Sequence, residues 1–244
     1  MILKKQYNKD ISLNINNFNC QDCFIYKQCI SNYIHSKITK FNKVFIKRKI
    51  LQKGSIIFKE KDTVKYLYIL CSGIIKNFFI TKHGEEQIIK FNYIGDLFGL
   101  DGFNSGYYNS FSQVIDKSIL CIIPLNIFKF LCDKIPSISS YIINIMSKEM
   151  KKNYQLIFLL SKRNAEKKIA TFIYNLSQNF RMKGISTNKI KLSMSRNDIG
   201  NYLGLTIETI SRILNKFKKN KILVIHGKYI LINNYLKLLK LVHY

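Results

Sequence analysis

The sequence contains no tryptophan, two prolines and only 14 acidic residues against 40 lysines and arginines. So few prolines exclude a proline-rich chain, and a hydrophobic content of 47% is enough to bury a core, so 244 residues indicate one or two globular domains. The scarcity of acidic residues leaves a formal net charge of +26, which favours a polyanionic partner. Because lysine, asparagine and isoleucine are abundant throughout, codon bias can account for part of this charge.

The sequence also lacks a long apolar run. No segment reaches the roughly eighteen apolar residues that span a bilayer, and residues 1–17 contain no continuous apolar stretch of the signal-peptide type. We therefore expect a cytoplasmic protein with no membrane partner. In the cytoplasm the six cysteines stay reduced, so a group of them indicates a metal-binding or redox site in preference to disulfide bonds.

Three of the cysteines are grouped near the start of the chain. Cys20, Cys23 and Cys29 form a C-x2-C-x5-C motif in a segment with too little periodicity for a helix or a strand. A loop of this kind can wrap its thiolates around a zinc ion or an iron–sulfur cluster. Both kinds of site usually need four protein ligands, so the motif is one ligand short.

The fourth ligand has three candidates, Cys71, Cys121 and Cys132, and spacing alone does not choose among them. Cys71 follows the apolar run YLYIL, and Cys132 lies in FKFLCDKIP. Small buried thiols are common in such surroundings, so a core-filling role is the preferred interpretation for these two.

The pattern of short runs after residue 50 indicates a β domain. Residues 31–49 first predict an amphipathic helix, and the runs SIIF, YLYIL, IIKNFFI, QIIKFNYI and SILCII then follow one another between turn signals. This spacing predicts a small antiparallel barrel or jelly roll. Pro124 should end its last strand, a short helix should cover residues 125–134, and Pro136 should open a longer helix.

The longer helix carries a narrow apolar seam. Its members are spaced alternately by three and four residues: Ile143, Met146, Met150, Asn153, Ile157 and Leu160. This pattern predicts a two-stranded coiled coil, and hence a homodimer, although an amphipathic helix lying on its own domain is the alternative. An asparagine inside a seam lowers stability but fixes register and strand number, so Asn153 favours the dimer.

Residues 193–231 predict a winged helix-turn-helix. Ser195 and Asp198 form an S-x-x-D start that resembles a capping box, Gly204 supplies the turn, and Thr206 caps the second helix, ETISRILNKFKK. The segment LVIHGKYILI then predicts a hairpin, the wing.

The outward face of the second helix has the chemistry to read bases. Glu208 can accept from a cytosine amino group, Ser211 can bond a base or a phosphate, and Arg212 can form two bonds to guanine. Thr206 and Thr209 lie in the same first turn and complete the predicted contact set. Because the seam predicts a two-fold dimer, the partner should be double-stranded DNA with palindromic half-sites about 34 Å apart.

The fold class that follows is α+β: an N-terminal antiparallel β-roll, a long dimerisation helix and a C-terminal winged helix-turn-helix. The predicted parts are a cysteine loop at 1–30, a β-roll sensor domain at 31–135, the dimerisation helix at 136–160 and the DNA-binding domain at 161–244.

This order of parts resembles the superfamily of the cyclic-AMP receptor and the fumarate-nitrate regulators (CRP/FNR), which are bacterial transcription regulators. The similarity covers essentially the whole chain and is greatest to the fumarate and nitrate reductase regulators. The segments that carry it are CQDC at 20–23, LLSKRNAEKK at 159–168, FIYNLS at 172–177 and DIGNYLGLTIETISR at 198–212. The resemblance implies a regulator of transcription with no catalytic residues, not an enzyme.

The resemblance also implies a cofactor and a mechanism. It assigns Cys121 as the fourth ligand, so that Cys20, Cys23, Cys29 and Cys121 would hold a 4Fe-4S cluster. It implies that oxygen converts the cluster to a 2Fe-2S form, after which the dimer loosens and DNA binding is lost. It assigns base reading to Glu208, Ser211 and Arg212, with a TTGAT-like half-site. It further implies contacts with RNA polymerase, for which the matching positions are Ser72, Gly73, Gly84, Lys117 and Lys183.

Several positions depart from the family pattern. Residues 95–115 contain no arginine, although cyclic-nucleotide sensors of the superfamily use one there, so no cyclic nucleotide is expected. Phe24 and Gln28 replace a small polar residue and a leucine beside the cysteines. Asn153 replaces an aspartate in the seam, which predicts a dimer that forms more readily without the cluster, since two facing aspartates would repel.

Two other interpretations remain open. A thiol redox enzyme would use Cys20 and Cys23, but such a pair normally opens a helix within a βαβ unit, whereas here it precedes a barrel. A dimeric DNA-binding regulator that is stabilised by zinc or needs no cluster is the second, because zinc accepts the same four thiolates.

Overall fold

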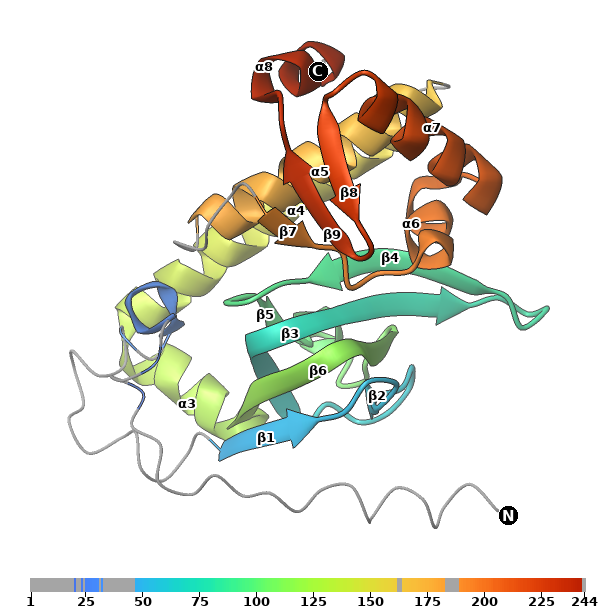
Figure 1. Ribbon diagram of the computed structural model, residues 1–244. Coiled ribbons are helices and arrows are strands. Elements are labelled where there is room, and N and C mark those ends of the chain that lie inside the picture. Colours follow the sequence, from blue (N-terminus) through green and yellow to red (C-terminus); the bar gives the residue numbers. More distant parts are fainter. Residues whose placement is uncertain are drawn as a thin grey trace. The chain divides into compact units, whose positions relative to one another are not determined.

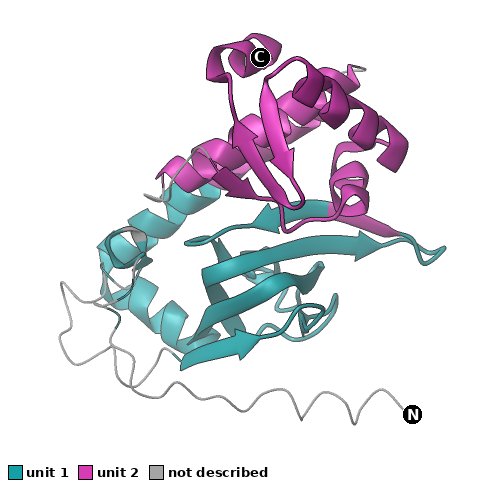
Figure 2. Cartoon of the chain, in the orientation of Figure 1, with its two compact units in different colours: residues 1–85, 89–147 teal, residues 86–88, 148–244 magenta. Residues whose placement is uncertain are grey.

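The computed structural model describes residues 20, 23, 25–30, 32, 47–161, 164–182 and 189–242. The chain divides into two compact units (Figure 2): unit 1 contains Met1–Glu85 and Ile89–Ser147, and unit 2 contains Glu86–Ile88 and Lys148–Tyr244. The division falls inside one long helix. No helix among the described residues has the length and apolar character needed to cross a bilayer.

Unit 1 is built on a six-stranded sheet, which confirms the predicted antiparallel β-roll (Figure 1). Its central strands lie in the order β1-β6-β3-β4, while β2 pairs with β6 and β5 pairs with β3. The strands are β1 (Lys47–Leu51), β2 (Ile56–Phe58), β3 (Tyr66–Ile80), β4 (Glu86–Asn92), β5 (Leu97–Phe98) and β6 (Phe111–Pro124).

Two predictions for this region need correction. YLYIL and IIKNFFI form one strand, β3, and the Ser72-Gly73 step between them is an irregularity in its pairing with β6, not a turn. Gly73 has φ +92°, and a Cβ there would lie 2.7 Å from the carbonyl oxygen of Lys117, so a glycine is required at this bulge.

The predicted helix at 31–49 is wrong at its end. Residues 47–49 belong to β1, where Arg48 pairs with Cys121 of β6. Pairing with a distant strand outweighs the local helical spacing here, because the ladder bonds and packing come from a partner far along the chain. Most of the remainder of that prediction lies outside the described residues.

The predicted helices of unit 1 are present. Helix α3 covers Leu125–Lys134, directly after Pro124, and helix α4 covers Pro136–Ser161, with Pro136 at its first position. Two short 3₁₀ turns were not predicted: η2 (Tyr26–Gln28) in the cysteine segment and η3 (Leu100–Gly102) after β5.

One buried cluster of the sheet domain contains four aromatic rings. The rings of Phe58 and Tyr108 stack with centroids 3.8 Å apart, and Tyr68 and Phe98 pack beside them. The Tyr108 hydroxyl donates a hydrogen bond to the carbonyl of Tyr66 at 2.6 Å. Phe98 and Tyr108 thus serve packing within the segment 95–115.

Unit 2 contains the predicted winged helix-turn-helix. Its elements are α5 (Ala165–Met182), β7 (Lys189–Lys191), α6 (Arg196–Leu203), α7 (Ile207–Lys219), β8 (Leu223–His226), β9 (Tyr229–Ile232) and α8 (Tyr235–Leu241). The hairpin β8-β9 turns at Gly227 as predicted, and β7 adds a third strand in the order β7-β9-β8. Neither β7 nor α8 was predicted, because three and seven residues are too short for a reliable periodic signal.

Candidate functional site

The cysteine segment is a run of tight turns. The backbone amides of Cys23, Tyr26, Cys29 and Asn32 each bond to the carbonyl three residues earlier, at 2.8–3.1 Å. Cys20, Cys23 and Cys29 all contribute backbone groups to these bonds, so the turns hold the backbone of all three predicted ligands.

Cys121 reaches the same neighbourhood from the sheet. It lies on β6, next to Arg48 of β1 and Ile69 of β3 in the pairing register. Cys29 and Cys121 belong to one buried core, and Cys23 packs against that core. The structure thus brings the segment that carries the predicted first three ligands against the strand that carries the fourth.

Arg48 provides positive charge beside these thiols. Its Nη2 donates a hydrogen bond to Sγ of Cys23 at 2.9 Å. The pKa of Cys20 is raised to about 11, first by burial and then by the charges of Cys121 and Cys29, while Arg48 acts in the opposite direction. The pKa of Cys121 is lowered to about 7, first by a hydrogen bond with Cys71 and also by Arg48, although burial acts in the opposite direction. Several thiols in one buried place cannot all ionise unless a cation joins them.

The donor set fits a thiolate-bound cluster, since four cysteines and a balancing arginine share one buried neighbourhood. Within the part of the chain that the structure describes, no three cysteine, histidine or acidic side chains are placed closely enough to hold a metal ion. Binding of a cluster would therefore bring the thiols closer together, as is common when metal binding is coupled to folding.

The other two cysteines differ in their surroundings. Cys132 packs against the same core from α3, as expected of a core thiol. Cys71 also packs against this core, but its Sγ lies only 3.2 Å from Sγ of Cys121. Neither this contact nor the position of Arg48 was predicted, because both depend on how β1, β3 and β6 pair.

Helix α4 has two apolar faces. Ile138, Tyr141, Ile142 and Ile145 pack against the core that contains Cys29 and Cys121. The six predicted seam residues are all exposed in the single chain, and four of them, Ile143, Met146, Met150 and Ile157, are 55–67% exposed. One face of α4 therefore packs on its own sheet domain, while the predicted seam lies exposed on another face of the same helix.

The exposed apolar surface of α4 is wider than predicted. Tyr154 and Phe158, which the sequence analysis left out, are 64% and 43% exposed and flank Asn153 and Ile157. A monomer that left this stripe in water would be unusual, because continuous apolar patches on soluble proteins generally mark contact surfaces.

The helix-turn-helix has the predicted caps. The Ser195 hydroxyl accepts from the amide of Asp198 at 3.0 Å, and the Asp198 carboxylate accepts from the amide of Ser195 at 2.8 Å. The Thr206 hydroxyl accepts from the amide of Thr209 at 3.3 Å at the start of α7. Gly204 has φ +63° at the end of α6, as a left-handed cap requires. These local bonds confirm both helix starts and the turn.

The predicted base readers occupy the accessible side of α7. Ile210, Ile213, Leu214 and Phe217 are buried on its inner face, as predicted. Thr206, Glu208 and Arg212 are exposed, while Thr209 and Ser211 are half-buried. Hydrogen bonds from its own backbone amide and from the Thr206 hydroxyl lower the pKa of Glu208, so it is an ionised acceptor at neutral pH.

Two lysines hold this domain together from α5 and α7. Lys168 is buried, and its Nζ donates to the carbonyl of Leu203 at the end of α6, at 3.2 Å. Lys216 forms an ion pair with Glu166 at 2.6 Å, so its charge is already partnered. The lysines left for phosphate contact along this edge are Lys218, Lys219, Lys221 and Lys228, all exposed.

The positions predicted to contact RNA polymerase fall into separate places. Ser72, Gly73 and Lys117 lie together where β3 meets β6, and Gly84 lies in the turn between β3 and β4. Lys183 lies outside the described residues.

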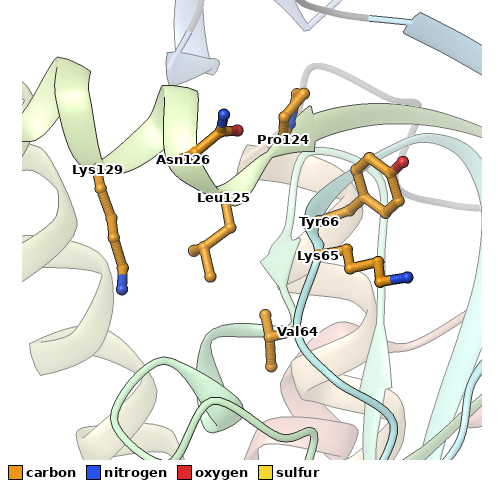
Figure 3. A pocket seen from close by; sticks show the side chains of 7 residues that line it. All are labelled: Val64, Lys65, Tyr66, Pro124, Leu125, Asn126 and Lys129. Carbon is orange, nitrogen blue, oxygen red and sulfur yellow. The ribbon is translucent and has the colours of Figure 1, made fainter.

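A pocket of about 430 Å³ lies between the start of β3 and the junction of β6 with α3 (Figure 3). Lys65 and Lys129 are its charged side chains, and its other lining residues are Val64, Tyr66, Pro124, Leu125 and Asn126. None of the predicted site residues lines it.

The chain matches two family models. Residues 192–223 match "Bacterial regulatory proteins, crp family", and residues 48–134 match "Cyclic nucleotide-binding domain". Among curated relatives, the "Fumarate and nitrate reduction regulatory protein" of Vibrio cholerae is 43% identical, over 91% of this chain and 89% of the relative. The protein of the same name from Escherichia coli K12 is 44% identical, over 88% of this chain and 86% of the relative.

Solved structures show the same fold. FixK2 from Bradyrhizobium japonicum superposes with a TM-score of 0.75 at 24% identity, covering 82% of this chain and 99% of that chain. A CooA mutant from Carboxydothermus hydrogenoformans gives a TM-score of 0.63 at 18% identity, covering 80% and 87% of the two chains.

Proposed function

Because the chain belongs to the CRP/FNR family of bacterial transcription regulators, and is thus a DNA-binding regulator and not an enzyme, we propose that it senses oxygen through an iron–sulfur cluster. In this proposal Cys20, Cys23, Cys29 and Cys121 hold a 4Fe-4S cluster in the absence of oxygen. The cluster-bound state of the protein favours a homodimer that binds palindromic DNA. Oxygen reverses this preference, and the protein acts in the cytoplasm with RNA polymerase as its partner.

One observation carries the proposal: the same buried core contains two of the cysteines and the first turns of the dimer helix. Cys29 and Cys121 pack together with Ile135 and Ile138, and the far side of α4 begins its exposed seam at Ile143. A change in how the cysteine segment packs therefore acts on α4 directly. A two-state equilibrium of this kind shifts by the difference in binding free energy between its states.

The chain's own residues have defined roles in this proposal. The bound cluster would supply the reactivity towards oxygen. The turns that contain Cys20, Cys23 and Cys29 would supply three thiolates, Cys121 on β6 would supply the fourth, and Arg48, which bonds to Cys23, would offset their negative charge. Ile135 and Ile138 couple this site to α4, whose opposite face holds the partner subunit.

The DNA contacts would come from α7 and the wing. Glu208, Ser211 and Arg212 would read a TTGAT-like half-site in the major groove, and the exposed lysines would hold phosphates. The wing β8-β9 follows the recognition helix, as in other winged domains.

The test is to purify the protein without oxygen and then admit air. The expected result is about four irons and four sulfides per chain, an absorption band of thiolate-bound iron that collapses in air, and parallel loss of dimer and DNA binding. Zinc in place of iron, with DNA binding unaffected by air, would show a zinc-stabilised regulator. A metal-free protein that binds DNA equally well in air would contradict oxygen sensing.

Replacing Arg212 with alanine should reduce specific DNA binding. A bidentate contact to guanine contributes about 1–3 kcal/mol of discrimination, so affinity for the palindrome should fall roughly 5- to 150-fold and the preference at one base position should disappear. Fluorescence anisotropy on wild-type and substituted sites measures both effects.

The matched control is Lys219→Ala at the exposed end of the same helix. A phosphate contact carries no sequence information, so this variant should weaken binding to all sequences alike and lower the salt dependence by about one unit. Equal loss of sequence preference in both variants would argue against base reading by Arg212.

Replacing Asn153 with aspartate should weaken the cluster-free dimer. Two facing carboxylates about 4 Å apart repel by roughly 1–4 kcal/mol, so the dissociation constant should rise about tenfold or more. Sedimentation of the cluster-free protein measures it. Gln155→Glu adds the same charge to α4 away from the seam and should have little effect; equal effects of the two variants would remove Asn153 from the interface.

A further inference from the structure

Cys71 lies against a proposed cluster ligand in a way that the sequence does not suggest. Its Sγ is 3.2 Å from Sγ of Cys121, and the two residues are 50 positions apart in the chain. Cys71 is on β3 and Cys121 is on β6, in strands that pair antiparallel. The two thiols are therefore in direct contact within the sheet.

An irregularity in the sheet produces this contact. Ile69 pairs with Cys121 and Leu70 with Leu120, but Ser72 and not Cys71 pairs with Ile119. The register thus shifts at Cys71, which becomes the extra residue of a bulge. Bulges redirect a side chain that would otherwise follow the alternation of the strand.

Arg48 lies beside Cys71 and Cys121 and also contacts the cysteine segment. It pairs with Cys121 across β1 and β6, and its guanidinium donates to Cys23. Burial lowers the pKa of Arg48, but the nearby Cys121, Cys71 and Cys23 raise it further than burial lowers it. Cys71 therefore shares its counter-charge with two of the proposed ligands.

The distance between the two sulfurs limits what they can do together. A tetrahedral metal with bonds of about 2.3 Å to sulfur keeps two sulfur ligands roughly 3.7 Å apart, and ligands on different irons lie farther apart still. At 3.2 Å, the sulfurs of Cys71 and Cys121 are closer together than two sulfur ligands of one metal, so the two thiols occupy a single ligand position between them.

We propose that Cys71 is an alternative ligand for the iron otherwise bound by Cys121, so that either thiolate completes the set of Cys20, Cys23 and Cys29. The inference rests on the proposed function, since it requires the cluster. Its consequence is that loss of the Cys121 thiol, by substitution or by chemical modification, leaves the cluster in place.

The test uses the full-length chain reconstituted with iron and sulfide without oxygen. Four proteins are compared for iron content, sulfide content and absorption spectrum: wild type, Cys71→Ser, Cys121→Ser and the double variant. Both single variants should keep the wild-type content, and the double variant should lose nearly all of it. A Cys121→Ser protein as empty as the double variant, beside a full wild type, would overturn the inference. An empty wild type would instead overturn the proposed cluster itself.

A second measurement does not depend on whether the double variant folds. After anaerobic reconstitution, alkylation with iodoacetamide and peptide mass spectrometry report which thiols are protected. In Cys121→Ser, Cys71 should be alkylated before reconstitution and protected after it. Equal alkylation of Cys71 before and after reconstitution would show that it does not take over as a ligand.

Discussion

Replacing Ile157 with glutamate is expected to convert the dimer into a monomer. Ile157 is 64% exposed in the single chain, so the folded protomer should tolerate the charge. In a two-stranded seam the two glutamates would be buried without partners, at a cost of about 3–5 kcal/mol, which raises the dissociation constant more than a hundredfold. Sedimentation of the cluster-loaded protein measures the dimer, and affinity for the palindrome should fall with it, because a monomer reaches only one half-site.

The matched control is Leu236→Glu on α8. Leu236 is 73% exposed and lies off the seam, so it receives the same apolar-to-acidic change without a predicted partner. This variant should remain dimeric. An Ile157→Glu protein that sediments as a dimer would place the self-association surface somewhere other than α4.

Replacing Cys29 with serine is expected to empty the cysteine site. Cys29 is buried in the core shared with Cys121 and α4, and it is one of the four proposed ligands. Iron should fall from about four per chain to nearly none, since a serine hydroxyl is a far weaker ligand for iron than a thiolate. Chemical analysis of iron and sulfide after anaerobic purification measures this, and the response of DNA binding to air should disappear.

Cys132→Ser is the control for this experiment. Cys132 packs against the same core from α3 without being a proposed ligand, so its loss should leave iron content unchanged. Full iron content in Cys29→Ser would contradict the assigned ligand set, whereas loss in both variants would point to a general packing defect.

The Ile157 and Cys29 variants separate the two halves of the proposed switch. Ile157→Glu should keep its iron while it loses the dimer. Cys29→Ser should lose iron, and its remaining dimer should depend on Asn153. If iron content and self-association always changed together, the seam and the cysteine site would be one structural element and not two coupled ones.

The sequence predicted the elements whose signals are local. The capping box of Ser195 and Asp198, the turn at Gly204 and the cap at Thr206 all depend on hydrogen bonds within three or four residues. The start of α4 at Pro136 and the end of β6 at Pro124 follow from the missing amide of proline. The exposed seam followed from periodicity alone, although Tyr154 and Phe158 widened it.

Other features depended on contacts with residues far along the chain, which the periodicity of a short segment does not reveal. Strand β1 replaced part of a predicted helix because β6 offered it a ladder of hydrogen bonds. Strand β7 joined the wing through its pairing with β9, and its three residues had no signal of their own. Lys168 reached the end of α6 from another helix, so its role could not be inferred from its neighbours in the chain.

By itself, the sequence determined the order of the parts, the helix caps, the exposed seam of α4 and the outward face of α7, because each is encoded in the spacing of nearby residues. Only the tertiary structure decided which cysteines meet. Spacing left Cys71, Cys121 and Cys132 as candidates, and the register of β3 against β6, shifted by a bulge at Cys71, brought two of them into contact. A shift of one residue in strand register changes the direction of the side chains, and packing across the whole sheet determines that register.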